Sequence, residues 1–239
     1  MPELSFLLTA GLAVLLGAVV QSGVGLGLGL VAAPVVALLH PEYMPGTMLV
    51  VTSVLPLFTL GTEWREIDWR GLGWAMLGRV PGTAAGVGVV ALVAPEVLGG
   101  AVGAMVLVAV ALTVRAVRVR LSRTALVVAG VVSGVTGTAT SIGGPPLALL
   151  YQHESGPRIR ATLGAYFLLG AVLSLGMLAA GGQLHAEHVR AGLWLLPFEV
   201  AGFLLGRPLA RVVDAGLIRA ALLCVVTVSG AALLVQSLL

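Results

Sequence analysis

Hydrophobic residues occur along the whole chain in stretches of about 18 or more, and only short polar turns separate them. An α-helix rises about 1.5 Å per residue, so each stretch is long enough to cross a hydrocarbon core of about 30 Å. We therefore predict an all-α integral membrane protein without a soluble domain. The pattern contains eight hydrophobic segments, which cover residues 4–39, 46–62, 71–94, 96–114, 124–152, 159–181, 191–212 and 216–238.

Two of the eight segments are interrupted by glycine and proline. As a single helix, the segment 4–39 would be about 54 Å long, which exceeds one crossing. It contains the run Gly23–Gly29, in which every second residue is glycine, and then Pro34. The segment 124–152 is interrupted at the matching place by Gly137, Gly143, Gly144, Pro145 and Pro146. We interpret both as pairs of half-helices, with a kinked single span as the alternative.

The two interrupted segments begin the halves of an internal repeat. A shift of 111 residues brings Ser22-Gly23 onto Ser133-Gly134. A shift of 120 residues further along superposes Arg70, Trp74, Gly82 and Gly86 on Arg190, Trp194, Gly202 and Gly206. The chain therefore reads as a first membrane repeat over 1–114, a basic cytoplasmic linker over 115–123 and a second membrane repeat over 124–239.

The positions of the arginines test whether the interrupted segments cross the membrane. If all eight segments cross, the loop arginines divide 7 against 5 between the two faces. If both interrupted segments return to the face that they entered from, the division is 11 against 1, and only Arg190 lies outside. Positive residues accumulate in cytoplasmic loops, which favours the second arrangement. It predicts two inverted repeats, each with one broken re-entrant segment and three crossing helices, and both termini outside the cell inner membrane.

The two breaks are the best candidates for a binding site, because backbone groups that glycine and proline leave unpaired in a membrane must be buried in protein or face a water-filled cavity. Helix N-termini and hydroxyl groups suit a small anionic substrate. The predicted substrate-binding residues of the breaks are Gly23, Gly25, Gly27, Gly29, Pro34, Thr138, Thr140, Ser141, Gly143, Gly144 and Pro145. Close helix packing is the alternative, and we prefer it for Gly82/Gly86 and Gly202/Gly206.

Arg79 and Glu199 are the clear charges inside the predicted membrane segments, and the shift of 120 residues places them at equivalent positions. They could form an ion pair across the repeat axis that neutralises two costly buried charges. In the functional interpretation, Arg79 binds the anion and Glu199 is the proton-coupling residue. Both interpretations stay open at the level of the sequence.

Composition and charge exclude several classes of protein. Apolar residues make up 59% of the chain and charged residues 10%, and the mean hydropathy is +1.09. The net charge of +3 comes from arginines in short loops, so it orients the protein in the bilayer and indicates no nucleic-acid partner. The single cysteine, Cys224, cannot form a disulfide within the chain. We expect no metal or other cofactor, and no constellation of catalytic side chains indicates an enzyme.

Several short motifs follow one another in a distinctive order. They are the glycine-rich stretch from Gly23 to Pro34, Ile67-Asp68-Trp69 with Gly82 and Gly86, Ser141-Ile142-Gly143-Gly144-Pro145, Arg160-Ala161-Thr162, and Gly202-Phe203-Leu204-Leu205-Gly206-Arg207. In this order, over nearly its whole length, the chain resembles the TauE/SafE family of sulfite and organosulfur anion exporters. The first glycine run departs from the pattern, since it lacks the Gly-Gly-Pro of the second half.

The resemblance implies a secondary transporter that exports sulfite, sulfoacetate or a related organosulfur or carboxylate anion, coupled to protons or to the membrane potential. It fixes neither the substrate nor the coupling ion. Nothing in the sequence decides the oligomeric state, and a homodimer stays open. The alternative from another class is a non-transporting membrane scaffold or assembly factor.

Overall fold

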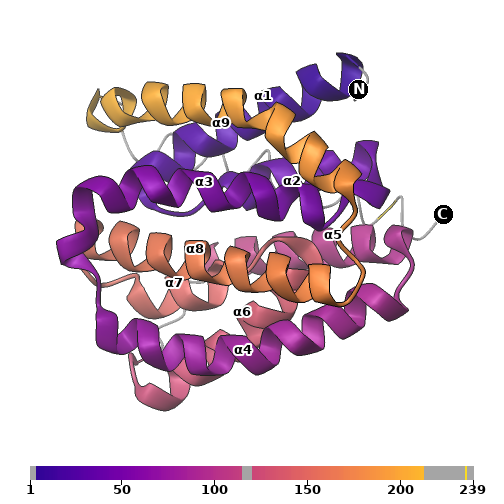
Figure 1. Cartoon of the computed structure of the whole chain (residues 1–239). Coiled ribbons are helices and arrows are strands. Elements are labelled where there is room, and N and C mark those ends of the chain that lie inside the picture. The colour runs from indigo at the N-terminus through magenta and orange to yellow at the C-terminus, as the bar shows by residue number, and fades with distance from the viewer. Residues whose placement is uncertain (1–3, 115–119, 213–234, 236–239) are drawn as a thin grey trace.

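The structure is a computed structural model that describes residues 4–114, 120–212 and 235, and these residues form only helices and connecting turns (Figure 1). Apart from residue 235, the eighth predicted segment lies outside the described residues, as do Cys224 and most of the basic linker. The helices are α1 (Leu4–Val24), α2 (Leu28–Leu39), α3 (Gly46–Glu63), α4 (Trp69–Leu92), α5 (Pro95–Val114), α6 (Arg123–Thr140), α7 (Pro145–Tyr151), α8 (Gly156–Ala180) and α9 (Ala186–Val212), with short 3-10 turns η1 (Pro41–Tyr43) and η2 (Trp64–Glu66).

Long apolar helices confirm the prediction of a membrane protein that crosses the bilayer several times. Among the described residues, five helices are long and apolar enough to cross a membrane, namely α1, α3, α4, α8 and α9. Each presents apolar side chains to the outside as well as to its neighbours, for example Leu8, Leu77 and Leu204, which are more than half exposed. Such a surface requires lipid around it.

The first interrupted segment is a helical hairpin. Gly25 and Gly27 have φ angles of 87° and 154°, which end α1 and reverse the chain before α2 begins at Leu28. The first turn of α2 is tied back to α1, because the N–H of Leu28 donates to Oε1 of Gln21 at 3.0 Å. At the open end of the hairpin, the ring of Phe6 lies 5.2 Å from the ring of His40. Both ends of the predicted segment 4–39 therefore lie at the same end of the molecule.

The second interrupted segment is also broken where predicted. Ser141 has a φ of 61°, which stops α6, and α7 begins at Pro145. The hydroxyl of Ser133 on α6 donates to the carbonyl of Gly143 in the break. The arms of the two segments differ in length from the half-helices that we predicted. α1 has 21 residues and α6 has 18, whereas α2 has 12 and α7 has 7. At about 1.5 Å per residue, the first arm of each segment is nearly a full membrane span.

Contacts between α3 and α9 show that these two helices run in the same direction. Near the start of both, the hydroxyl of Thr47 donates to the carbonyl of His188 at 3.1 Å. Near the end of both, Arg207 donates to the hydroxyl of Thr62 at 2.9 Å.

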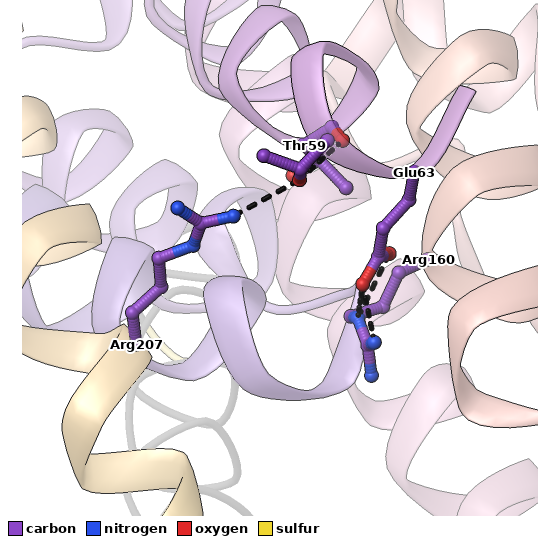
Figure 2. A network of polar contacts seen from close by, with 5 residues as sticks. Thr59, Glu63, Arg160 and Arg207 are labelled. Carbon is purple, nitrogen blue, oxygen red and sulfur yellow. Dashed lines mark hydrogen bonds and ion pairs between the residues drawn. The ribbon is translucent and has the colours of Figure 1, made fainter.

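α4 and α8 also run parallel to each other. The N–H of Asp68, directly before α4, donates to the hydroxyl of Thr162 near the start of α8. At the other end, Gly181 after α8 lies against Val87 of α4. This second pair is antiparallel to the first, because Glu63 at the end of α3 forms an ion pair with Arg160 near the start of α8 (Figure 2).

Glycines bring the remaining long helices into direct backbone contact. On α4, a Cβ at Gly86 would lie 2.9 Å from the carbonyl oxygen of Val135, and one at Gly82 would collide with the backbone of Val131. Gly202 and Gly206 bring α9 onto α1 in the same way, against the backbone of Leu15 and Val19. The predicted packing role of both glycine pairs is confirmed. In both contacts the two helices run parallel, since residue numbers increase together.

The arginines gather at one end of this bundle. The turn between α3 and α4 lies at that end, and Arg160 and Arg207 reach the end of α3 there (Figure 2). Arg158 lies 3.7 Å from Asp68, and the guanidinium of Arg123 lies 5.4 Å from the ring of Trp74. Arg190 is near the start of α9, at the opposite end, where the connection from α8 lies (Figure 1).

Candidate functional site

The two helix breaks meet inside the bundle. Gly29 in the first turn of α2 faces the carbonyl oxygen of Ser141, and a Cβ at Gly29 would lie 2.8 Å from that oxygen. Gly144 similarly leaves room for Leu26. The Ser141 hydroxyl donates to the carbonyl of Pro45 at 3.0 Å, which fixes the second break against the turn before α3. At Gly29 the approach leaves no space for a side chain because the neighbour is backbone, whereas at Gly144 a side chain would have to displace the end of Leu26.

A cavity lies where the breaks meet. The space open to the centre of a water molecule is about 40 Å³. About 10–15 Å³ by the same measure holds one water, so the cavity has room for a small ion or a few waters. The polar side chains of the cavity wall are Gln21, Thr52, Arg79 and Ser141, and backbone is contributed by Gly29, Gly137, Gly143 and Gly144. The apolar part of the wall consists of Leu26, Leu30, Leu49, Ile142, Phe167 and Ala171.

Arg79 is the charged side chain of the cavity wall. It projects from α4, is only 3% exposed, and its Nη1 lies 3.4 Å from the hydroxyl oxygen of Ser133. The guanidinium carbon lies 4.8 Å from the ring centre of Tyr166, a cation–π distance. Gly170 on α8 makes room for the group, since a Cβ there would lie 2.5 Å from the guanidinium carbon. The Nε atom of Arg79 is buried without a hydrogen-bond partner in the described structure.

Arg79 and Glu199 do not form the ion pair that one interpretation of the sequence predicted. Arg79 faces α6 and α8, whereas Glu199 on α9 faces α3, where its Oε1 accepts a hydrogen bond from the N–H of Leu55 at 2.8 Å. Each charge is held by the neighbours of its own helix, and the ion-pair interpretation is wrong for this structure.

Glu199 is fully buried at the contact between α9 and α3. Its Oε2 is also buried and has no hydrogen-bond partner in the described structure. The residue after Leu55 is Pro56, whose ring clashes with the helical carbonyl four residues before it and so opens α3 at this point. This opening lets the Leu55 N–H turn toward the carboxyl group. Glu199 does not line the cavity, but Thr52, one turn before Leu55, does.

The predicted site residues fall into two groups. Gly29, Arg79, Ser141, Gly143 and Gly144 line the cavity. Gly23, Gly25, Gly27, Thr138, Thr140 and Pro145 lie in the breaks or beside them. Pro34 lies inside α2, which continues from Leu28 to Leu39, so the prediction that Pro34 interrupts the first segment is wrong.

The hydroxyls of Thr138 and Thr140 serve the protein itself in this structure. Thr138 shares a hydrogen bond of 2.8 Å with Ser174 on α8. Thr140 donates to the carbonyl of Thr136 and accepts from the N–H of Ile142, which caps the end of α6. Of the predicted hydroxyls, only that of Ser141 lines the cavity, and its proton is already donated to the carbonyl of Pro45. The expected cluster of hydroxyls that donate to an anion is therefore not formed by these residues in this structure.

The helix N-termini contribute less than the sequence suggested. α7 begins with Pro145 and Pro146, which have no N–H groups to offer. In α2, the N–H of Leu28 is occupied by Gln21, although the next N–H groups, beginning with that of Gly29, lie at the cavity. The positive charge of the site therefore comes mainly from Arg79.

Sequence reasoning missed Gln21 and Thr52 on the cavity wall, and Tyr166 and Gly170 behind Arg79. Gln21 could have been identified from the sequence, because burying an amide in an apolar membrane segment is energetically unfavourable unless the amide has a function or a hydrogen-bond partner. Tyr166 and Gly170 could not be identified in this way, since aromatic residues and glycines are common in membrane helices.

An all-helical membrane protein whose broken helices meet at a buried polar cavity has the architecture of a secondary transporter. The profile of the family described as "Sulfite exporter TauE/SafE" matches residues 10–233, nearly the whole chain. The chain belongs to this family of membrane transporters, and the resemblance seen in its motifs is confirmed. Neither a curated protein nor a solved structure matches the chain.

Proposed function

We propose that this protein is a secondary transporter that exports a small anion across the cell inner membrane, and that the anion binds beside Arg79. One observation carries the proposal: a buried guanidinium, without a carboxylate partner in the described structure, faces a cavity formed by two helix breaks. Arginine is well suited to oxyanions because its planar donors match them. The backbone of Gly143 and Gly144 supplies further polar groups, whereas the Ser141 hydroxyl already donates to Pro45.

The proposed substrate is sulfite or a small organosulfur or carboxylate anion such as sulfoacetate. Family membership supports the sulfur anion. The small volume of the cavity supports the smaller members of this group, and in this conformation it favours sulfite over sulfoacetate.

We further propose that the chain consists of two inverted repeats, 1–114 and 124–239, joined by a cytoplasmic linker over 115–123. Helix directions support this arrangement. α1, α3 and α9 run one way, and α4, α6 and α8 run the other way. Counterparts α1 and α6, α3 and α8, and α4 and α9 are therefore antiparallel, as inverted repeats require.

The arginine-rich end of the bundle is the proposed cytoplasmic end, and both termini then lie outside. Positive residues accumulate on the cytoplasmic face of inner-membrane proteins. A terminal-tag accessibility assay in intact cells tests this orientation, and a tag accessible only from the cytoplasm contradicts it.

Glu199 is the proposed proton-coupling residue. A carboxylate buried in a membrane is expensive when charged, so its protonation responds to changes around it. α3 connects Glu199 to the cavity, because Leu55 contacts the carboxyl group and Thr52 lines the cavity one turn away. An anion entering the cavity can thus be linked to proton uptake through the opened turn of α3.

Sulfite flux into proteoliposomes tests the proposed function. We expect Arg79→Gln to lose at least about 30-fold in flux, since truncating one partner of a buried charged pair costs roughly 2–5 kcal/mol. Arg190→Gln is the matched control, because Arg190 is exposed at the other end of the bundle and should transport normally. Wild-type protein without flux of sulfite, sulfoacetate or a carboxylate analogue contradicts transport and leaves the scaffold hypothesis. Undiminished flux in Arg79→Gln contradicts the proposed site.

A further inference from the structure

Among the described residues, no carboxylate forms an ion pair with Arg79. Its side-chain hydrogen-bond partner there is the neutral hydroxyl of Ser133 at 3.4 Å, and its face lies against the neutral ring of Tyr166. None of the ion pairs in the described part of the chain includes Arg79. Glu199, the one described carboxylate at similar depth, is held at Leu55 instead. Arg79 therefore enters the cavity with its full positive charge.

Arginine cannot relieve this situation by losing a proton, because the guanidinium keeps its charge in proteins. A buried charge without a partner is strongly unfavourable in a membrane interior. An anion in the cavity can neutralise this charge, since the cavity lies directly beside Arg79 and has room for one small ion. Its wall combines a cation, the Gln21 amide and apolar side chains such as Leu30 and Phe167. This chemistry suits a weakly hydrated inorganic monoanion.

We propose that a small inorganic anion of the halide class occupies the cavity beside Arg79 whenever the transported substrate is absent. The substrate then binds by displacing this resident ion. This inference rests on the proposed anion site, but not on which substrate is transported. Its functional consequence is competition, in which the apparent KM for substrate rises with halide concentration by the factor 1 + [halide]/Kd.

Thermal unfolding of the purified full-length protein in detergent tests the inference with chloride as the probe. Sodium chloride replaces sodium gluconate at constant ionic strength, since gluconate is too large for the cavity. At ten times its Kd, chloride should raise the Tm of the wild-type protein by about 3–5 °C, because a ligand that binds only the folded state stabilises it. Bromide should act similarly. Arg79→Gln should show no chloride-dependent shift, and Arg190→Gln should keep the wild-type shift.

Equal Tm values for the wild-type protein in chloride and gluconate would overturn the proposal. A chloride shift that persists in Arg79→Gln would also overturn it, because the effect would then come from elsewhere. If Arg79→Gln does not fold, crystals of the wild-type protein grown in bromide decide the question: anomalous density between Arg79 and Ser141 supports the resident anion, and bromide absent from the cavity refutes it.

The proposed function is tested separately by sulfite flux. Normal flux without any chloride effect leaves the transporter intact and removes the resident anion. A chloride effect without flux of any candidate substrate supports the resident anion and contradicts the proposed transport function.

Discussion

Gly170 allows a sharp test of how the anion site is built. This residue faces Arg79 from α8, and a Cβ added there would lie 2.5 Å from the guanidinium carbon. Ordinary contacts between such atoms begin near about 3.5 Å, so Gly170→Ala requires a displacement of about 1 Å. The guanidinium is enclosed by Tyr166 and by Gly137 and Gly143, which leave it little room except toward the cavity.

The displacement should weaken substrate binding more than it destabilises the protein. Nη1 of Arg79 is already 3.4 Å from Ser133, so a shift of about 1 Å breaks this contact and moves the charge into the space that the anion needs. A misplacement of about 1 Å at a functional group can cost about 100-fold. We expect the KM for sulfite to rise about 10- to 100-fold, while overpacking lowers stability by about 1–3 kcal/mol.

Sulfite flux at varied substrate concentration, together with Tm, measures both effects. Gly176→Ala is the matched control, because Gly176 lies on the same helix and a Cβ there meets nothing within 4 Å. It should change neither the KM nor the Tm noticeably. The reasoning is refuted if Gly170→Ala keeps the wild-type KM, or if Gly176→Ala raises the KM as much.

Three further predictions concern coupling, packing and acid stability. Glu199→Gln keeps an acceptor for the Leu55 N–H, so the protein should fold, but flux should no longer respond to a pH gradient; wild-type pH dependence would sink the coupling role. Gly82→Ala should lower stability by about 1–3 kcal/mol because it meets the backbone of α6, whereas Gly88→Ala, with nothing within 4 Å, should be neutral in Tm. Burial pushes the pKa of Asp68 upward, but the Gly71 N–H, the Tyr151 hydroxyl and Arg158 outweigh it and hold the pKa below its usual value. The resulting stability is present above about pH 4 and lost as the pH falls through the lowered pKa, so Asp68→Asn should lower the Tm at neutral pH and lose this difference in acid.

The sequence predicted the helix breaks well because their cause is local. Only glycine adopts the φ angles of Gly25 and Gly27 without strain, and proline is favoured in the first turn of a helix, where Pro145 lies. The predicted lengths of the helices on either side of the breaks were wrong, since α1 continues through Gly23. A glycine inside a helix costs only about 1 kcal/mol, so glycine alone does not say where a packed helix ends.

The direction of a side chain on a membrane helix could not be predicted. α4 is apolar on most of its surface, and hydropathy therefore does not reveal that Arg79 faces α6 and α8. The same holds for Tyr166 and Gly170, whose importance depends on a neighbour from another helix. The depth of a residue in the membrane can be predicted by counting residues along its helix. The direction in which its side chain points depends on how the helix is rotated about its axis, which is set by packing against other helices.

In the proposed duplicated fold, the separation of Arg79 and Glu199 lets the two halves bind different partners, an anion and a proton. The proposed repeat places each charge in a matching group of three helices, Arg79 among α4, α6 and α8 and Glu199 among α9, α1 and α3. Because the axis exchanges these groups, the charges stay apart, and each acquires its own chemistry. Arg79 faces the cavity with an open positive charge, while Glu199 touches the opened turn of α3. One connection between the two groups is the contact of α3 with α8, which pack together at Glu63 and Arg160, and Thr52 of α3 lines the cavity beside Arg79. Coupling between anion and proton would then be a movement of this helix pair and not a contact between the two charges.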